Sequence, residues 1–141
     1  MTSHSDLQQQ MVAWRRDLHQ HPEFGFEEKR TAAFVAETLR SFGLDVAEGI
    51  GGTGVVGTLK AGKSNRAIAL RADMDALRIA ETGNTEWKSR TPGTMHACGH
   101  DGHTTMLLGA ARTLAEDGGF DGTIRFIFQP AEEWGRGALA M

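Results

Sequence analysis

The sequence of 141 residues contains one cysteine, three prolines and no tyrosine, and it has no long apolar run. One cysteine excludes an internal disulfide, so Cys98 is a buried apolar thiol, an exposed free thiol, a nucleophile or a metal ligand. No segment approaches the roughly 20 apolar residues needed to cross a bilayer. The first six residues also lack an apolar signal segment behind a basic start. We therefore predict a cytoplasmic protein without a membrane partner.

The sequence also lacks an excess of positive charge. Its formal net charge is -3, and nothing in the composition indicates a basic face that could neutralise phosphates, so no nucleic-acid partner is predicted. Hydrophobic residues make up 40% and charged residues 23%, a balance that allows a core and excludes disorder by composition. The length suits one domain or a piece of a larger one, and we predict one unit over residues 1–141.

The spacing of apolar residues predicts helices alternating with short strands. Helices are expected over residues 7–20, 27–41 and 104–116, and strands over residues 44–47, 54–60, 66–71 and 123–129. The run Ala67–Leu70 has no polar alternation, which predicts a central strand covered on both faces. Residues 81–94 should form a loop, and another helix is expected from Glu132 onward. This α/β layout places functional sites at the ends of strands.

Cys98, His100 and His103 place three potential metal ligands within six residues. Thiolate and imidazole are preferred ligands of zinc and similar transition metals. The glycines between them let the backbone turn tightly, so that the side chains can converge. The alternative is a helix N-terminus with incidental histidines and Asp101 as its cap. A further histidine at position 96, with carboxylates upstream and downstream, favours the metal site.

Asp73 and Asp75 follow a predicted strand and point the same way if that strand continues. Two carboxylates held together raise each other's pKa unless a cation neutralises them, and a metal, a metal-bound histidine or Arg71 could do so. The alternative is a solvated turn at the end of the strand. For Asp75 we favour a role in orienting a ligating histidine.

Glu132 and Glu133 follow the strongest predicted strand, directly after Pro130 and Ala131. Adjacent glutamates at the start of a helix often only interact with the helix dipole. After a strand, however, one carboxylate could bind a metal while its neighbour takes a proton from the activated water. His19 either reaches this site or serves as a solvated or capping group.

Four segments together resemble the M20 metallopeptidase family, most closely its amidohydrolase branch, which includes hippurate hydrolases and N-acyl-amino-acid amidohydrolases. These segments are residues 17–23, 71–77, 95–103 and 129–133. The resemblance implies an α/β, zinc-peptidase-like catalytic domain with a central mixed sheet flanked by helices. It also implies one or two divalent ions, zinc or manganese. The implied reaction is hydrolysis of the amide bond of a small-molecule N-acyl amino acid, giving a carboxylic acid and an amino acid.

The resemblance also implies roles for individual residues. By position, Cys98, His100 and Glu133 match metal ligands, Glu132 matches the general base, and Asp75 matches the aspartate that supports the metal site. Arg78 stands where the family usually has proline, a change that alters a turn but touches no ligand.

The resemblance covers only an N-terminal portion of the longer family members. The remaining ligands, the last strands and the lid domain, through which the complete enzyme forms a homo-oligomer, are therefore expected to be missing. We expect weak or no activity from the chain alone. Two alternatives stay open, namely a dipeptidase or aminopeptidase of the same family and a non-catalytic, metal-binding truncation product.

Overall fold

The computed structural model describes residues 4–141. Residues 1–3, part of the segment predicted to carry no signal peptide, lie outside the described residues. The elements are, in chain order, α1 (His4–Gln20), α2 (Lys29–Ser41), β1 (Asp45–Ile50), β2 (Gly54–Ala61), β3 (Ala67–Asp73), α3 (His100–Asp117), β4 (Gly122–Gln129) and α4 (Gly137–Ala140). The predicted α/β order is confirmed, and residues 81–94 contain no helix or strand, as expected.

The strands form one mixed sheet in the order β1-β2-β4-β3. Strands β1 and β2 are antiparallel because a short turn joins them, and β2 is also antiparallel to β4. Strand β3 runs parallel to β4, and the chain between them crosses over through α3. In this parallel pair the carboxyl ends of both strands lie at the same end of the sheet, so the residues that follow them come close together.

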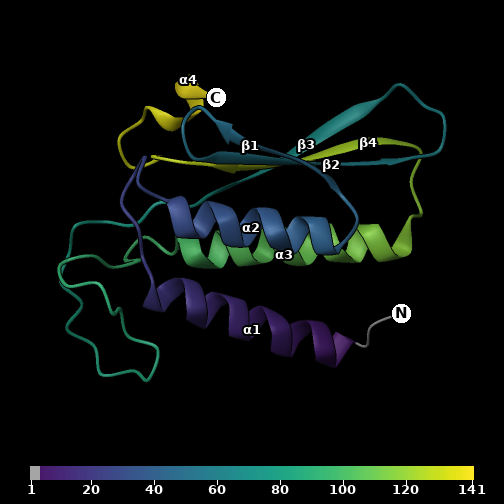
Figure 1. The fold of residues 1–141 in the computed structure, drawn as a ribbon. Coiled ribbons are helices and arrows are strands. Elements are labelled where there is room, and N and C mark those ends of the chain that lie inside the picture. The colour runs from purple at the N-terminus through teal and green to yellow at the C-terminus, as the bar shows by residue number, and fades with distance from the viewer. Residues whose placement is uncertain (1–3) are drawn as a thin grey trace.

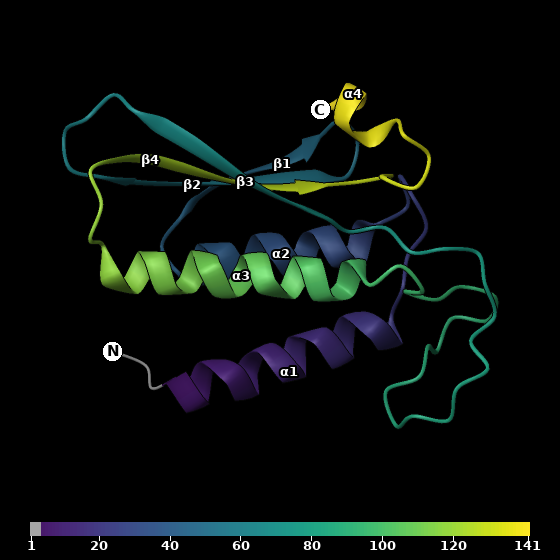
Figure 2. The same ribbon diagram turned by 180° about the vertical axis from the view of Figure 1, so that it is seen from behind.

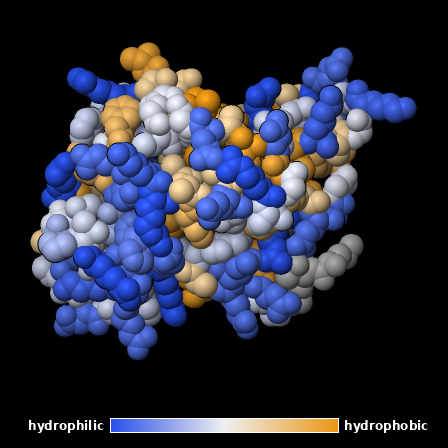
Figure 3. Space-filling model, viewed as in Figure 1, coloured by the Kyte–Doolittle hydropathy of each residue, from blue (hydrophilic) through white to orange (hydrophobic). Residues whose placement is uncertain are grey.

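The helices form layers beneath the sheet. Figures 1 and 2 show α2 and α3 side by side against one face, with α1 on their far side. The side chains of Phe126 and Phe128, which alternate along β4, are fully buried and pack with Leu39 and Leu108 from the helices. Apolar side chains reach the surface mainly in the upper half of Figure 3, over the sheet and α4. None of the helices described is both long and apolar enough to span a membrane.

Two predictions about the elements are wrong. The run Ala67–Leu70 is not in a central strand, because β3 lies at an edge of the sheet and Ile68 is 60% exposed. No helix begins at Glu132, since residues 132–135 form a turn and Gly135 has a φ of 62°, which a right-handed helix does not contain. Only the short α4 follows that turn.

Candidate metal centre

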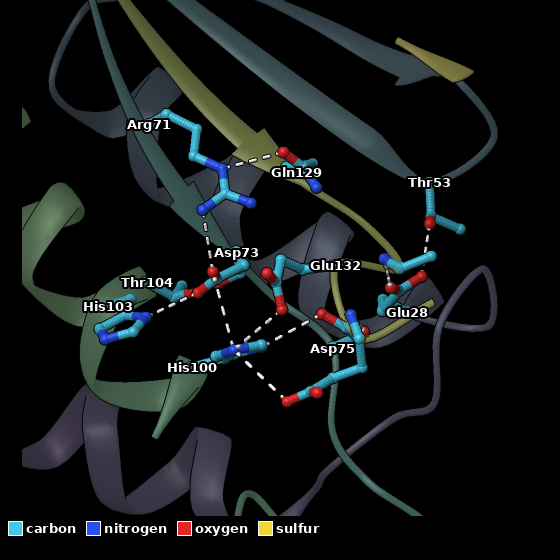
Figure 4. Close-up of polar contacts among 12 residues, drawn as sticks. Glu28, Thr53, Arg71, Asp73, Asp75, His100, His103, Thr104, Gln129 and Glu132 are labelled. Carbon is cyan, nitrogen blue, oxygen red and sulfur yellow. Dashed lines mark hydrogen bonds and ion pairs between the residues drawn. The ribbon is translucent and has the colours of Figure 1, made fainter. Parts of the chain in front are cut away.

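The candidate site lies where β3, β4 and α3 meet. Asp73 pairs with Gln129 in the parallel register, so the residues that follow β3 and β4 lie at the same end of the sheet. Helix α3 begins at His100 at the same end, and Thr104 in its first turns donates a hydrogen bond to the backbone oxygen of Asp73 at 2.8 Å. The backbone therefore brings three distant sequence segments together (Figure 4).

The three predicted metal ligands lie together. Cys98, His100 and Glu133 each offer one ligand atom, and these atoms lie within 4.8 Å of one another. The His100 side chain is 3% exposed, Glu133 is 22% exposed and Cys98 is exposed. Oε1 of Glu133 is a buried atom without a hydrogen-bond partner among residues 4–141. A thiol, an imidazole and a carboxylate oxygen that makes no hydrogen bond within residues 4–141 fit, at this separation, a divalent cation such as zinc.

The two nitrogens of His100 face different surroundings. Nδ1 lies 3.1 Å from Oδ1 of Asp75, which is itself buried. Nε2 lies 3.7 Å from carboxylate oxygens of Asp73, Glu132 and Glu133 (Figure 4). Donation from Nδ1 to Asp75 leaves the Nε2 lone pair pointing toward the carboxylates, the arrangement that a metal-ligating histidine requires. This geometry supports the predicted orienting role of Asp75.

The Asp75–His100 pair shifts both pKa values in ways that favour a charged pair. Burial alone would raise the pKa of Asp75, but the hydrogen bond to His100 and the backbone amides of Glu133 and Glu132 lower it below its usual value. Burial also opposes the charged form of His100, yet the hydrogen bond to Asp75 and the nearby carboxylates raise its pKa above the usual value. In the metal-free chain, a proton therefore competes for His100 with any metal ion.

Asp73 and His103 form a second pair beside His100. Nδ1 of His103 lies 2.7 Å from Asp73, whose other carboxylate oxygen accepts a hydrogen bond from Arg71 at 3.0 Å. The His103 ring stacks on the ring of His100, with centroids 5.5 Å apart. The sequence pointed to Arg71 and a metal-bound histidine as groups that could neutralise the two aspartates. In the structure Arg71 contacts Asp73 and His100 contacts Asp75.

The sequence did not reveal the role of Asp101. It is not the helix cap, because Gly99 occupies that position with a φ of 85°, and Asp101 is 1% exposed. Its Oδ2 contacts Nε of Arg15 at 2.9 Å and Nδ1 of His19 at 2.7 Å. His19 is thus neither solvated nor a cap. It is buried and ties Asp101 to Glu81, whose Oε1 lies 3.2 Å from Nε2.

His96 is also buried, at 4% exposure, and neither of its ring nitrogens has a hydrogen-bond partner among residues 4–141. Burial lowers its pKa to about 4, so the ring is neutral at physiological pH. Its ring centroid lies 6.4 Å from that of His19. His96 is therefore a buried, neutral ring that packs near His19.

Comparison with known proteins shows the family to which the chain belongs. The sequence model described as peptidase family M20/M25/M40 matches residues 69–141, slightly more than half of the chain and all of the candidate ligands. The chain belongs to this family. The family model thus confirms the resemblance seen in the sequence.

Individual M20 relatives agree over almost the whole chain. Hippurate hydrolase of Campylobacter jejuni is 53% identical over 136 residues, which cover 96% of this chain and 35% of that protein. The N-acyl-L-amino acid amidohydrolase of Geobacillus stearothermophilus is 49% identical over 129 residues, covering 91% of the chain and 35% of the relative. Thermostable carboxypeptidase 2 of Saccharolobus solfataricus is 48% identical over 132 residues, covering 92% and 34%. The chain thus spans about a third of the length of these relatives.

Solved M20 structures contain the same fold. A Bacillus subtilis protein described as a dinuclear metal binding peptidase superimposes with a TM-score of 0.94 at 39% identity, covering 98% of this chain and 39% of that one. The architecture described above is therefore that of part of an M20 catalytic domain.

Cys98 of this M20 chain is exposed, but its surroundings raise the pKa of its thiol, so the thiol keeps its proton at neutral pH. A hydrogen bond with Glu133, then burial of the thiol, and then the charges of Glu133, Glu132 and Asp73 raise its pKa to about 11. A metal ion that binds Cys98 must therefore displace a proton.

The raised pKa predicts slow alkylation of Cys98. A pKa of about 11 lowers the thiolate fraction at neutral pH roughly a hundredfold below that of an ordinary cysteine, and the greater nucleophilicity of a more basic thiolate recovers about tenfold of this. We expect iodoacetamide to modify the metal-free folded chain about tenfold more slowly than the same chain in urea. Mass spectrometry over time measures both rates. Equal rates would show that Glu133 does not protect the thiol.

Proposed function

We propose that this chain supplies the metal centre of a hydrolase that cleaves the amide bond of N-acyl amino acids and releases a carboxylic acid and an amino acid. The observation that carries the proposal is the convergence of Cys98, His100 and Glu133 within 4.8 Å, with the carboxylate of Glu132 beside them. Relatives named as hippurate hydrolase and N-acyl-L-amino acid amidohydrolase support this substrate class.

In the proposed mechanism the residues of the site have different roles. Cys98, His100 and Glu133 would hold the ion, and Asp75 keeps His100 in the orientation for binding through the 3.1 Å contact with Nδ1. A divalent ion held by these residues would supply Lewis-acid chemistry, polarising the amide carbonyl and lowering the pKa of a water molecule. Glu132 is 39% exposed and lies beside Nε2 of His100, so it can reach both water and substrate. It accepts the proton of the attacking water and passes it to the leaving amine nitrogen.

A second candidate function is peptide hydrolysis. Two relatives are named as thermostable carboxypeptidases, and they are 48% and 47% identical to this chain. Cleavage of a peptide needs the same ion and general base, so this alternative differs in the acyl group rather than in the chemistry of the centre.

The activity is best tested in a polypeptide of the relatives' length, because the chain spans about a third of them. This chain would replace the 136 aligned residues of the Campylobacter jejuni hippurate hydrolase. With Zn²⁺ or Mn²⁺ we expect the hybrid to release glycine from benzoylglycine faster than it cleaves free dipeptides. Replacing Glu132 by glutamine should lower kcat by about 10²–10⁴, the usual contribution of a general base.

The parent hydrolase is the positive control, and the isolated 141-residue chain should show little turnover. A folded hybrid that binds the ion but releases no amino acid from any acylated substrate would contradict the proposal. Faster cleavage of dipeptides than of benzoylglycine would favour the peptidase instead.

A further inference from the structure

A buried carboxylate outside the ligand set contacts the segment that carries Glu132 and Glu133. Glu28 occupies the N-cap position of α2, but its side chain makes no capping hydrogen bond, and the residue is 0% exposed. Its Oε1 accepts a hydrogen bond from the backbone amide of Ala131 at 2.8 Å, and its Oε2 accepts one from the hydroxyl of Thr53 at 2.6 Å (Figure 4). Glu28 makes no ion pair among residues 4–141. A buried carboxylate without a cation is costly, so the hydrogen bonds that Glu28 accepts from Ala131 and Thr53 are needed to stabilise it.

The residue that Glu28 holds is in an unusual conformation. Ala131 has a φ of 46°, in the left-handed region that residues other than glycine rarely adopt, and it is completely buried. Gly25 packs directly against it, since a Cβ at Gly25 would lie only 3.0 Å from both Cα and Cβ of Ala131. The turn after β4 is thus fixed from one side by residues that precede α2.

The same turn is held from the other side by Asp75. Oδ2 of Asp75 accepts a hydrogen bond from the backbone amide of Glu133 at 3.1 Å, while Oδ1 contacts His100. Glu28 therefore holds the backbone at Ala131 and Asp75 holds it at Glu133, on either side of Glu132. Between these two anchors the side chains of Glu132 and Glu133 both reach to 3.7 Å from Nε2 of His100.

We propose that Glu28 is a positioning residue of the metal centre, whose carboxylate holds Ala131 and thereby sets where Glu132 and Glu133 meet His100. It touches neither the ion nor the substrate. This inference rests on the proposed function, because it requires Glu133 to bind a metal ion. It adds a residue from the N-terminal part of the chain, more than 60 positions before the first candidate ligand, Cys98.

The test compares metal binding by variants of the 141-residue chain. Zn²⁺ affinity is measured by competition with a chromophoric chelator, and Co²⁺ loading reports ligand geometry through the absorption band of the cobalt–thiolate bond. Glu28→Ala should weaken Zn²⁺ binding at least about tenfold, as expected for a residue that orients a ligand, and should alter the cobalt band. Glu28→Gln should stay within about threefold of the unmodified chain, because its amide oxygen still accepts the Ala131 hydrogen bond.

Glu27→Ala is the matched control. Its carboxylate is 65% exposed and lies 3.5 Å from an exposed Arg78, so its loss should change Zn²⁺ affinity by less than about twofold. Gly25→Ala is a second probe in case Glu28→Ala fails to fold. The added methyl group would displace Ala131 directly while Glu28 stays intact, and the variant should also weaken binding and alter the cobalt band.

The outcomes separate the two proposals. If Glu28→Ala and Gly25→Ala fold, bind Zn²⁺ as tightly as the unmodified chain and keep its cobalt band, Glu28 has only a structural role and the inference is overturned. Reduced thermal stability with unchanged affinity would overturn it as well. If the unmodified chain itself binds no Zn²⁺, the proposed metal centre fails, and the positioning role fails with it.

Discussion

The apparent affinity of the chain for Zn²⁺ is expected to rise at least about a hundredfold between pH 6 and pH 8. The main cause is Cys98, whose pKa the contact with Glu133 raises to about 11. Over this pH range Cys98 is a thiol in the metal-free chain, and a zinc-bound cysteine is a thiolate. Each binding event therefore releases one proton, which makes the affinity rise about tenfold for each pH unit.

His100 adds to the pH dependence in the same direction. Burial opposes its charged form, but the hydrogen bond to Asp75 and the nearby carboxylates outweigh burial and raise its pKa above 6.5. A protonated imidazole cannot bind a metal, so a second proton is displaced at the acid end of the range. The slope should consequently be steeper near pH 6 and approach one proton per ion at higher pH.

Chelator competition at fixed ionic strength from pH 6 to pH 8 measures this effect, and proton release in weakly buffered solution checks it. Cys98→Ser is the control, because serine keeps its proton in this range. That variant should bind Zn²⁺ more weakly, and its affinity should no longer show the roughly tenfold rise per pH unit that comes from the Cys98 proton. A flat affinity between pH 7 and pH 8 in the unmodified chain would show that Cys98 is not a ligand.

The second large effect is expected when the two adjacent glutamates, Glu132 and Glu133, are replaced one at a time. Glu133→Ala should weaken Zn²⁺ binding on the order of a hundredfold, because it removes one of three strong ligands, a larger loss than that of an orienting partner. Glu132→Ala should change the affinity by only about threefold, because it removes a nearby charge but no ligand. The two residues are chemically identical and adjacent, so each is the matched control for the other.

The structure gives both carboxylates the same 3.7 Å separation from Nε2 of His100. What favours Glu133 as the ligand is its buried Oε1, which makes no hydrogen bond within residues 4–141, and its place in the group with Cys98. Calorimetric titration of both variants with Zn²⁺, with circular dichroism to verify folding, measures the difference. Equal losses would contradict the division of roles, and a larger loss in Glu132→Ala would exchange them.

The sequence was most informative where structure depends on near neighbours. Apolar spacing placed α1, α2, α3 and β4 within a few residues of their observed bounds, because periodicity records which face of an element is buried. It failed at Ala67–Leu70, where an uninterrupted apolar run indicated burial on both faces but the described chain leaves Ile68 exposed at a sheet edge. Whether such a run is covered depends on partners that periodicity does not specify.

The sequence alone predicted a metal centre, because Cys98 and His100 are ligand types at short spacing and Glu132 and Glu133 follow shortly after a strand. The structure brings these residues together, and their roles stay predictions. The groups that support these residues became apparent only in the folded chain. The contacts of Glu28 with Ala131 and of His19 with Asp101 join residues that lie 103 and 82 positions apart. Such contacts depend on strand order and helix packing, which set distances between remote segments and leave no local pattern in the sequence.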